Sequence, residues 1–260
     1  MNDFQRDLAH PVMFSLTSGK GGVGKTSIAV NLAFALSQKK QRVLLVDGDL
    51  GLANVDVLLK ISVKGTIRDI LENAIDPLSA VVYIEPNLGV LPSGSGVPQM
   101  LGLGDKERSY LEGILRNIAK HFDIVLFDTA AGIGPSVLWF NTLVDHNIVV
   151  VSPDPTSMTD AYALIKVMAQ DRGRSDFHIL INSVKDEKEG QEIYATLANV
   201  AGRFLKLSPK HLGSVPQDAE VVRAVREQRP FLQKSPQSKA AQAIHNLAAR
   251  LMTMNGKPDK

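Results

Sequence analysis

The chain has 260 residues, 44% of them hydrophobic and 22% charged, which is enough apolar material to bury one large core as a single domain over residues 1–260. It contains no cysteine, which excludes disulfides, thiolate zinc sites, iron–sulfur clusters and cysteine nucleophiles. The formal net charge is only +2 and no run of lysines and arginines forms a stripe, so nucleic acid is not an expected partner.

Apolar strands alternate with helical periods along the chain. The predicted order is strand 11–18, helix 26–38, strand 41–49, helix 65–73, strand 88–94, helix 106–121, strand 122–129, helix 134–143, strand 146–152, helix 156–170, strand 176–184, helix 188–204, strand 211–216, and helices 219–227 and 237–252. Strands this continuously apolar are buried on both faces. The pattern therefore predicts an α/β fold with a doubly wound, mainly parallel sheet between two layers of helices. Residues 1–11 and 254–260 are expected to be flexible ends.

Targeting and membrane signals are not evident in the sequence. The first ten residues are polar, and the apolar stretches are far shorter than the roughly 20 residues that a membrane helix needs. We therefore expect a cytoplasmic protein.

The loop after the first strand carries the strongest motif. Its residues fit G-x-x-x-x-G-K-[ST] between a strand and a helix, the context that a phosphate-binding loop requires. Backbone N–H groups in such a loop point at phosphate oxygens, Lys25 can reach the β- and γ-phosphates, and the Thr26 hydroxyl can bind Mg²⁺. The residues predicted to contact a nucleotide here are Gly21, Gly22, Val23, Gly24, Lys25, Thr26 and Ser27.

Carboxylates follow two of the predicted strands. Asp47, Asp49 and Asp56 follow the second strand, and their spacing alone does not assign them to helix capping or to holding a water molecule. Asp128 ends the apolar strand 122–129, as the acid of a Walker B motif does, and could hold a Mg²⁺-bound water. Because ligands bind at the carboxyl ends of strands in such sheets, these acids and the loop predict one nucleotide site.

The stretch "KGGVGKT", with an additional lysine at Lys20, resembles the deviant Walker A motif of the MinD/ParA class of P-loop ATPases. "DGDLGLANVDVLL", "PDPTSMTDAYALIK" and "GSVPQDAEVVRAVREQRPF" most resemble the MinD-like regulators of flagellar number and placement, the FlhG or FleN group. The resemblance extends along nearly the whole chain and implies the P-loop NTPase fold.

The resemblance also implies roles for individual residues. Without it, Lys20 would be interpreted as a solvated cation of the loop; with it, Lys20 is expected to cross a dimer interface and contact the nucleotide of the other subunit. Asp49 matches the acid that positions the attacking water, Asp47 the acid before it, and Asp128 the acid near Mg²⁺. The residues implied to contact or flank the adenine base are Asn182, Pro216, Gln217 and Asp218, and Asp154 matches a position that can approach the partner's nucleotide.

The implied function is an ATP-dependent dimerisation switch with slow hydrolysis of ATP, which uses Mg²⁺ and regulates flagellar number or placement. Implied partners are the flagellar GTPase FlhF, flagellar switch proteins or a flagellar transcription regulator. Two alternatives remain open. One is a ParA-type partitioning ATPase, for which Arg203, Lys206 and Lys210 form only a small basic patch, and the other is a nucleotide-binding scaffold without significant hydrolysis.

Membrane binding is the property of this class that the sequence supports least. Apolar residues recur at helical spacing in the last predicted helix, at Ala240, Ile244, Leu247, Ala248 and Leu251. Such a stripe is more typical of a core-facing helix than of a membrane anchor. We expect weak or indirect membrane association, peripheral at the inner face of the membrane or at the cell pole.

Overall fold

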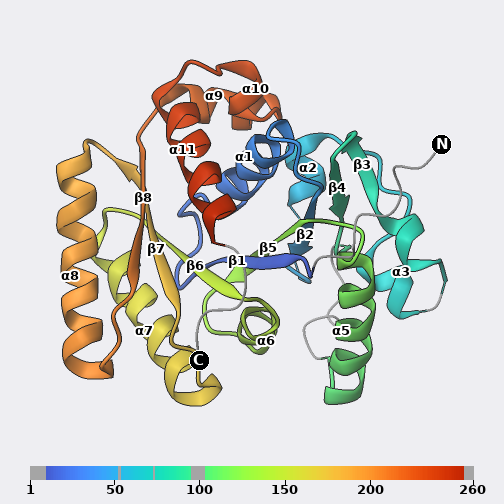
Figure 1. Ribbon diagram of the computed structural model, residues 1–260, viewed down its shortest axis with the longest axis horizontal. Coiled ribbons are helices and arrows are strands. Elements are labelled where there is room, and N and C mark those ends of the chain that lie inside the picture. Colours follow the sequence, from blue (N-terminus) through green and yellow to red (C-terminus); the bar gives the residue numbers. More distant parts are fainter. Residues whose placement is uncertain (1–9, 52–53, 73, 95–102, 255–260) are drawn as a thin grey trace.

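The computed structural model describes residues 10–51, 54–72, 74–94 and 103–254. Residues 1–9 and 255–260, which form most of the ends expected to be flexible, lie outside this part of the chain. One sheet of eight strands, in the order β3-β4-β2-β5-β1-β6-β7-β8, runs across the described chain (Figure 1). All neighbouring strands are parallel except β3 and β4, which confirms the predicted mainly parallel sheet.

The bounds of the elements follow the predicted order closely. The strands are β1 (Val12–Ser18), β2 (Val43–Gly48), β3 (Val82–Glu85), β4 (Leu88–Leu91), β5 (Ile124–Ala131), β6 (His146–Val151), β7 (Phe177–Val184) and β8 (Lys210–Pro216). The helices are α1 (Lys25–Gln38), α2 (Val55–Leu59), α3 (Ile67–Leu71), a 3₁₀ turn (Pro77–Ala80), α5 (Asp105–Ala119), α6 (Pro135–Leu143), α7 (Pro155–Arg172), α8 (Glu187–Leu205), α9 (Ala219–Glu227), α10 (Phe231–Lys234) and α11 (Lys239–Thr253).

Four short elements were not predicted. They are α2, the 3₁₀ turn, β3 and α10, each only four or five residues long. Elements of this length are too short to show a hydrophobic period. Strand β3 runs antiparallel to β4 and closes one edge of the sheet.

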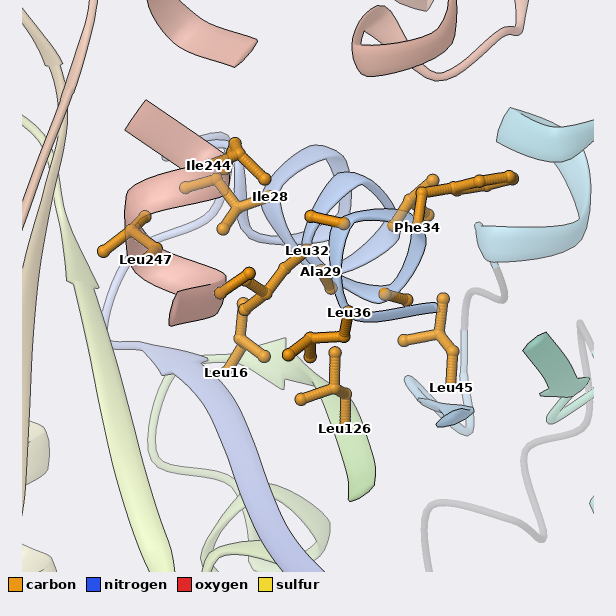
Figure 2. Packing of buried hydrophobic residues seen from close by; sticks show 14 of the residues in the cluster. Leu16, Ile28, Ala29, Leu32, Phe34, Leu36, Leu45, Leu126, Ile244 and Leu247 are labelled. Carbon is orange, nitrogen blue, oxygen red and sulfur yellow. The ribbon is translucent and has the colours of Figure 1, made fainter. Parts of the chain in front are cut away.

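Helices cover both faces of the sheet. In Figure 1, α1, α9, α10 and α11 lie on one side of the sheet, and α5, α6 and α7 lie on the other. Helix α1 is apolar around most of its circumference because the sheet covers one side of it and α11 covers another. Figure 2 shows Ile28 and Leu32 of α1 between Leu16 of the sheet and Ile244 of α11.

The buried polar side chain of Asn31 joins α1 to α10. Its Nδ2 donates to the carbonyl of Ser27 at 2.7 Å, and its Oδ1 accepts the N–H of Leu232 at 2.9 Å. Both ends of the amide are satisfied, so this polar group fixes α10 against α1 rather than weakening the core.

Helix α11 faces the core. The five apolar residues of its predicted stripe are all 3% exposed or less, which confirms the core interpretation of that stripe. Within the described ranges, no helix combines the length and the apolar character needed to span a membrane.

Candidate nucleotide site

The carboxyl ends of β2, β5 and β1 bring the predicted site together. These strands are neighbours in the sheet, with Asp47 and Asp128 paired in register and Leu16 of β1 paired with Asp128. The loop that leaves β1 and enters α1 therefore lies beside both acids, as expected for ligand sites in doubly wound sheets.

The loop from Gly19 to Gly24 requires glycine for two reasons, a positive φ at Gly22 and Gly24 and a close contact at Gly19. Gly24 has φ +91°, and a Cβ there would lie 2.4 Å from Asn182 Nδ2. A Cβ at Gly19 would lie 2.1 Å from the carbonyl oxygen of Asp160. Helix α1 begins at Lys25 without a side-chain cap, so its first N–H groups remain able to bind an anion.

Lys25 and Asp128 form the buried centre of the site. Lys25 is 8% exposed; burial lowers its pKa, while the charges of Asp128 and Asp49 oppose that effect. Burial raises the pKa of Asp128 to about 6, although a hydrogen bond from the Thr26 side chain and the charge of Lys25 act to lower it. A buried carboxyl and a buried ammonium whose charges interact are typical of functional sites.

Two buried polar atoms at the site lack a hydrogen-bond partner among the described residues. They are Ser27 Oγ and Asp128 Oδ1. Unpaired buried oxygen atoms are costly in a folded protein and point to a missing ligand, ion or water. Together with the uncapped helix and Lys25, these oxygens fit a nucleotide phosphate and a Mg²⁺ ion with its waters.

The structure resolves what spacing left open for the acids at the end of β2 and in the loop after it. Asp47 is fully buried and accepts N–H groups of Asp49, Asn54 and Val55 at 3.0–3.2 Å, so it holds the loop and the first turn of α2. Burial and the neighbouring Asp128 raise its pKa to about 7. Asp49 is partly exposed near Lys25, and Asp56 accepts the N–H of Val57, a local turn contact.

Lys20 is held by residues of its own chain at the start of α7. Its Nζ lies 2.8 Å from Asp154 Oδ1 and 2.6 Å from Thr156 Oγ1. Asp154 also caps α7 through the N–H of Ser157, and Ser152 donates to its other oxygen. The hydrogen bond from Lys20 and those from the Ser152 and Thr156 hydroxyls hold the pKa of Asp154 well below its usual range.

The residues predicted to surround the base lie at the ends of β7 and β8. Asn182 Nδ2 donates to the carbonyl of Val23 at 2.7 Å, which places this amide against the phosphate-binding loop. Gln217 N–H donates to the carbonyl of Val184 at 2.7 Å. Asp218 accepts the N–H groups of Glu220 and Ala240, so its carboxylate begins α9 and contacts α11.

A second polar cluster lies at the amino ends of β6, β7 and β8, at the opposite edge of the sheet. Asp176 Oδ2 is 2.8 Å from His146 Nδ1 and 3.0 Å from His178 Nε2, and Asp176 Oδ1 is 2.9 Å from Lys210 Nζ. Burial raises the pKa of Asp176, but the three hydrogen bonds together hold it well below its usual range. The spacing of these ligand types would suit a metal ion. However, Lys210 and the nearby Arg174 already balance the carboxylate, so this cluster is a structural ion network.

A family model described as "CobQ/CobB/MinD/ParA nucleotide binding domain" matches residues 14–231. The chain belongs to this family. The match spans the phosphate-binding loop, both acid-bearing strands and Asn182. It confirms the MinD/ParA class predicted from the deviant loop.

Relatives place the chain near flagellar proteins of this family. The antiactivator FleN of Pseudomonas aeruginosa is 39% identical over 243 residues, which cover 93% of this chain and 87% of FleN. The flagellum site-determining protein YlxH of Helicobacter pylori is 32% identical over 244 residues, which cover 92% of this chain and 81% of YlxH. The predicted resemblance to the FlhG or FleN group is confirmed.

A solved structure shows the same fold. The septum site-determining protein MinD from Pyrococcus horikoshii, complexed with Mg-ADP, superposes with a TM-score of 0.78. The sequences are 23% identical, and the match covers 95% of this chain and 98% of that MinD. This likeness confirms the P-loop NTPase fold.

Sequence reasoning missed several contacts of the site. Thr156 and Ser152, which complete the Lys20–Asp154 network, carried no motif signal of their own. The Asp176 network was also missed, because His146 and His178 are far apart in the chain and meet only through strand pairing. A comparison of the polar residues at the starts of the strands predicted to be neighbours in the sheet would have found this network.

Proposed function

We propose that this protein is an ATP-dependent dimerisation switch that hydrolyses ATP slowly and regulates flagellar number or placement. The observation that carries the proposal is the meeting of Lys25, Asp128 and the glycine loop at adjacent strand ends, with a second lysine, Lys20, at the rim. Membership of the nucleotide-binding family supports ATP as the ligand, and the similarity to FleN and YlxH supports a role in flagellar regulation.

The residues divide the work of binding. The loop amides and Lys25 would hold the phosphates, and the Thr26 hydroxyl with a water on Asp128 would hold Mg²⁺. Asn182 would exchange its bond to Val23 for the base or use its side-chain carbonyl oxygen, with Pro216 and Gln217 beside it. Mg²⁺ supplies charge neutralisation between the phosphates.

Asp49 is the residue proposed to position the water that attacks. It is partly exposed, close enough to Lys25 to affect its pKa, and its backbone is fixed by Asp47 and by the hydroxyl of Ser93. Positioning without a strong base favours slow turnover, which suits a switch better than a metabolic enzyme.

Lys20 is proposed to complete the dimer across the partner's nucleotide. To do so it would leave Asp154, with which it forms a pair whose side chains are each 40% exposed. Exposed pairs of this kind contribute at most about 1 kcal/mol, so separating them is a small cost. A cation placed beside a triphosphate in a site with little water gains more than this, and the equilibrium therefore depends on which nucleotide is bound.

Size-exclusion chromatography with light scattering tests the switch. The wild-type protein should be a dimer with Mg·ATP and a monomer with Mg·ADP. Lys20→Ala should bind nucleotide but stay monomeric, whereas Asp49→Ala should accumulate as the ATP-bound dimer with little phosphate release. Lys188→Ala, which removes an exposed lysine on α8, is the matched control and should behave as wild type. A wild-type molar mass that does not change with nucleotide would refute the proposal.

A further inference from the structure

A groove lies between the C-terminal ends of α2 and α9, on the side of the sheet covered by α1, and residues of β3 and α10 also line it. It has a volume of about 530 Å³. Its apolar lining comes from Phe34, Leu59, Ile61, Ile84 and Pro230. Figure 2 shows Phe34 pointing away from the other labelled residues of α1, on the side of that helix opposite α11. We call this feature the α2–α9 groove.

The rim of the α2–α9 groove is positively charged. Lys60 and Arg229 are both exposed at the rim, and neither forms a salt bridge with any described residue. The other charged lining groups are Lys234, which pairs with Glu227, and Glu85, which keeps its negative charge although it accepts a hydrogen bond from Gln233. The groove lining therefore combines three cations and one carboxylate with an apolar floor, and its charge is positive on balance.

Exposed apolar side chains also lie on both helices whose ends border the groove. Val57 of α2 is 56% exposed, and Val222 and Val225 of α9 are 55% and 41% exposed. The two helices are joined directly, because Gln228 Nε2 donates to the carbonyl oxygen of Val57 at 2.9 Å. Exposed valines beside a concave apolar site are typical of an interaction surface rather than of ordinary solvent-facing helices.

We propose that the α2–α9 groove binds an acidic amphipathic helix of a partner protein. Apolar side chains spaced one turn apart on such a helix would enter the groove, and flanking carboxylates would meet Lys60 and Arg229. A helix is about 10 Å wide, so only the apolar edge of the partner helix would enter the groove.

Both walls of the groove continue into loops of the nucleotide site. The first N–H groups of α2 are held by Asp47, and α9 begins at its cap, Asp218. A change at either loop would move one wall relative to the other and strain the Gln228–Val57 contact. Partner binding and nucleotide binding are then reciprocally coupled, a part of the inference that rests on the proposed function.

Selection from a library of displayed random peptides about four helical turns long, on the full chain with Mg·ATPγS, tests the binding surface. Enriched peptides should be net acidic with apolar residues one turn apart. In fluorescence anisotropy, the double variant Lys60→Glu/Arg229→Glu should weaken their binding about tenfold or more. Lys106→Glu/Lys188→Glu makes the same charge change on α5 and α8 and should leave binding unchanged. Affinity with ATPγS and with ADP should differ about fivefold or more.

Other occupants give different results and would overturn the proposal. Enriched peptides that are basic, or that bind the double variant as well as wild type, exclude an acidic partner in this groove. If the double variant instead loses only the ATP-dependent dimer, the groove is a contact between copies of this chain; if it loses only binding to phosphatidylglycerol vesicles, the groove faces a membrane. Acidic peptides could also bind the groove while the molar mass of the protein does not change with nucleotide. That result would support the docking surface and refute the dimerisation switch.

Discussion

Replacing Asp154 by asparagine should make ATP-dependent dimerisation easier. In the structure this carboxylate holds the Lys20 ammonium of the same chain at 2.8 Å. Asparagine is also a good helix N-cap, its oxygen can keep the N–H of Ser157, and its amide can donate to Ser152. The variant therefore removes the charge without removing the cap.

The size of the effect follows from the exposure of the pair. With both side chains 40% exposed, the ion pair contributes about 0.5–1 kcal/mol. A symmetric dimer releases Lys20 in two protomers, so the gain is about 1–2 kcal/mol, or roughly a five- to thirtyfold lower dimer Kd. The effect should shrink at high salt because the pair is screened.

Sedimentation equilibrium with Mg·ATPγS over a range of protein concentrations measures this Kd. Asp171→Asn makes the same charge change near the other end of α7 and should leave the Kd at the wild-type value. With ADP both variants should stay monomeric. An Asp154→Asn protein that dimerises no more tightly than wild type, or more weakly, would show that Asp154 does not restrain Lys20.

Three further predictions concern stability. Burial raises the pKa of Asp47 to about 7 and of Asp128 to about 6. Above about pH 4 the folded protein therefore holds protons that the unfolded chain has already released, so the Tm without nucleotide should fall as the pH rises from about 4 to about 7. Asp128→Asn should make this fall smaller. A Tm that rises over the same pH range would contradict the raised pKa values. Asp176→Asn should lower the free energy of unfolding by about 2 kcal/mol in urea titrations, because two histidine N–H groups lose the carboxylate that they share. An unchanged urea midpoint would show that this network does not contribute to stability. Gly24→Ala should cost about 1–2 kcal/mol for its positive φ, with a further loss from contact with Asn182, and should weaken nucleotide binding in calorimetry. Gly113→Ala, which meets open space inside α5, is the control for binding and should leave the nucleotide affinity unchanged.

The sequence by itself determined the fold class and the main motifs. Continuous apolar runs such as 122–129 can be buried only inside a sheet covered on both faces, and helical periods between them require parallel crossovers. The phosphate-binding loop is readable because all its requirements, glycines for backbone N–H groups and Lys25 for charge, lie within a few consecutive residues. The family followed from that one loop.

Only the tertiary structure decided which side chains meet across the sheet. Lys20 finds Asp154 at a sequence separation of 134 residues, and Asp176 finds two histidines through the pairing of β6 with β7. Asp47 caps α2, a helix too short for its period to be seen. These contacts depend on strand order and register, which long-range packing selects. The periodicity of neighbouring residues carries no information about that order or register.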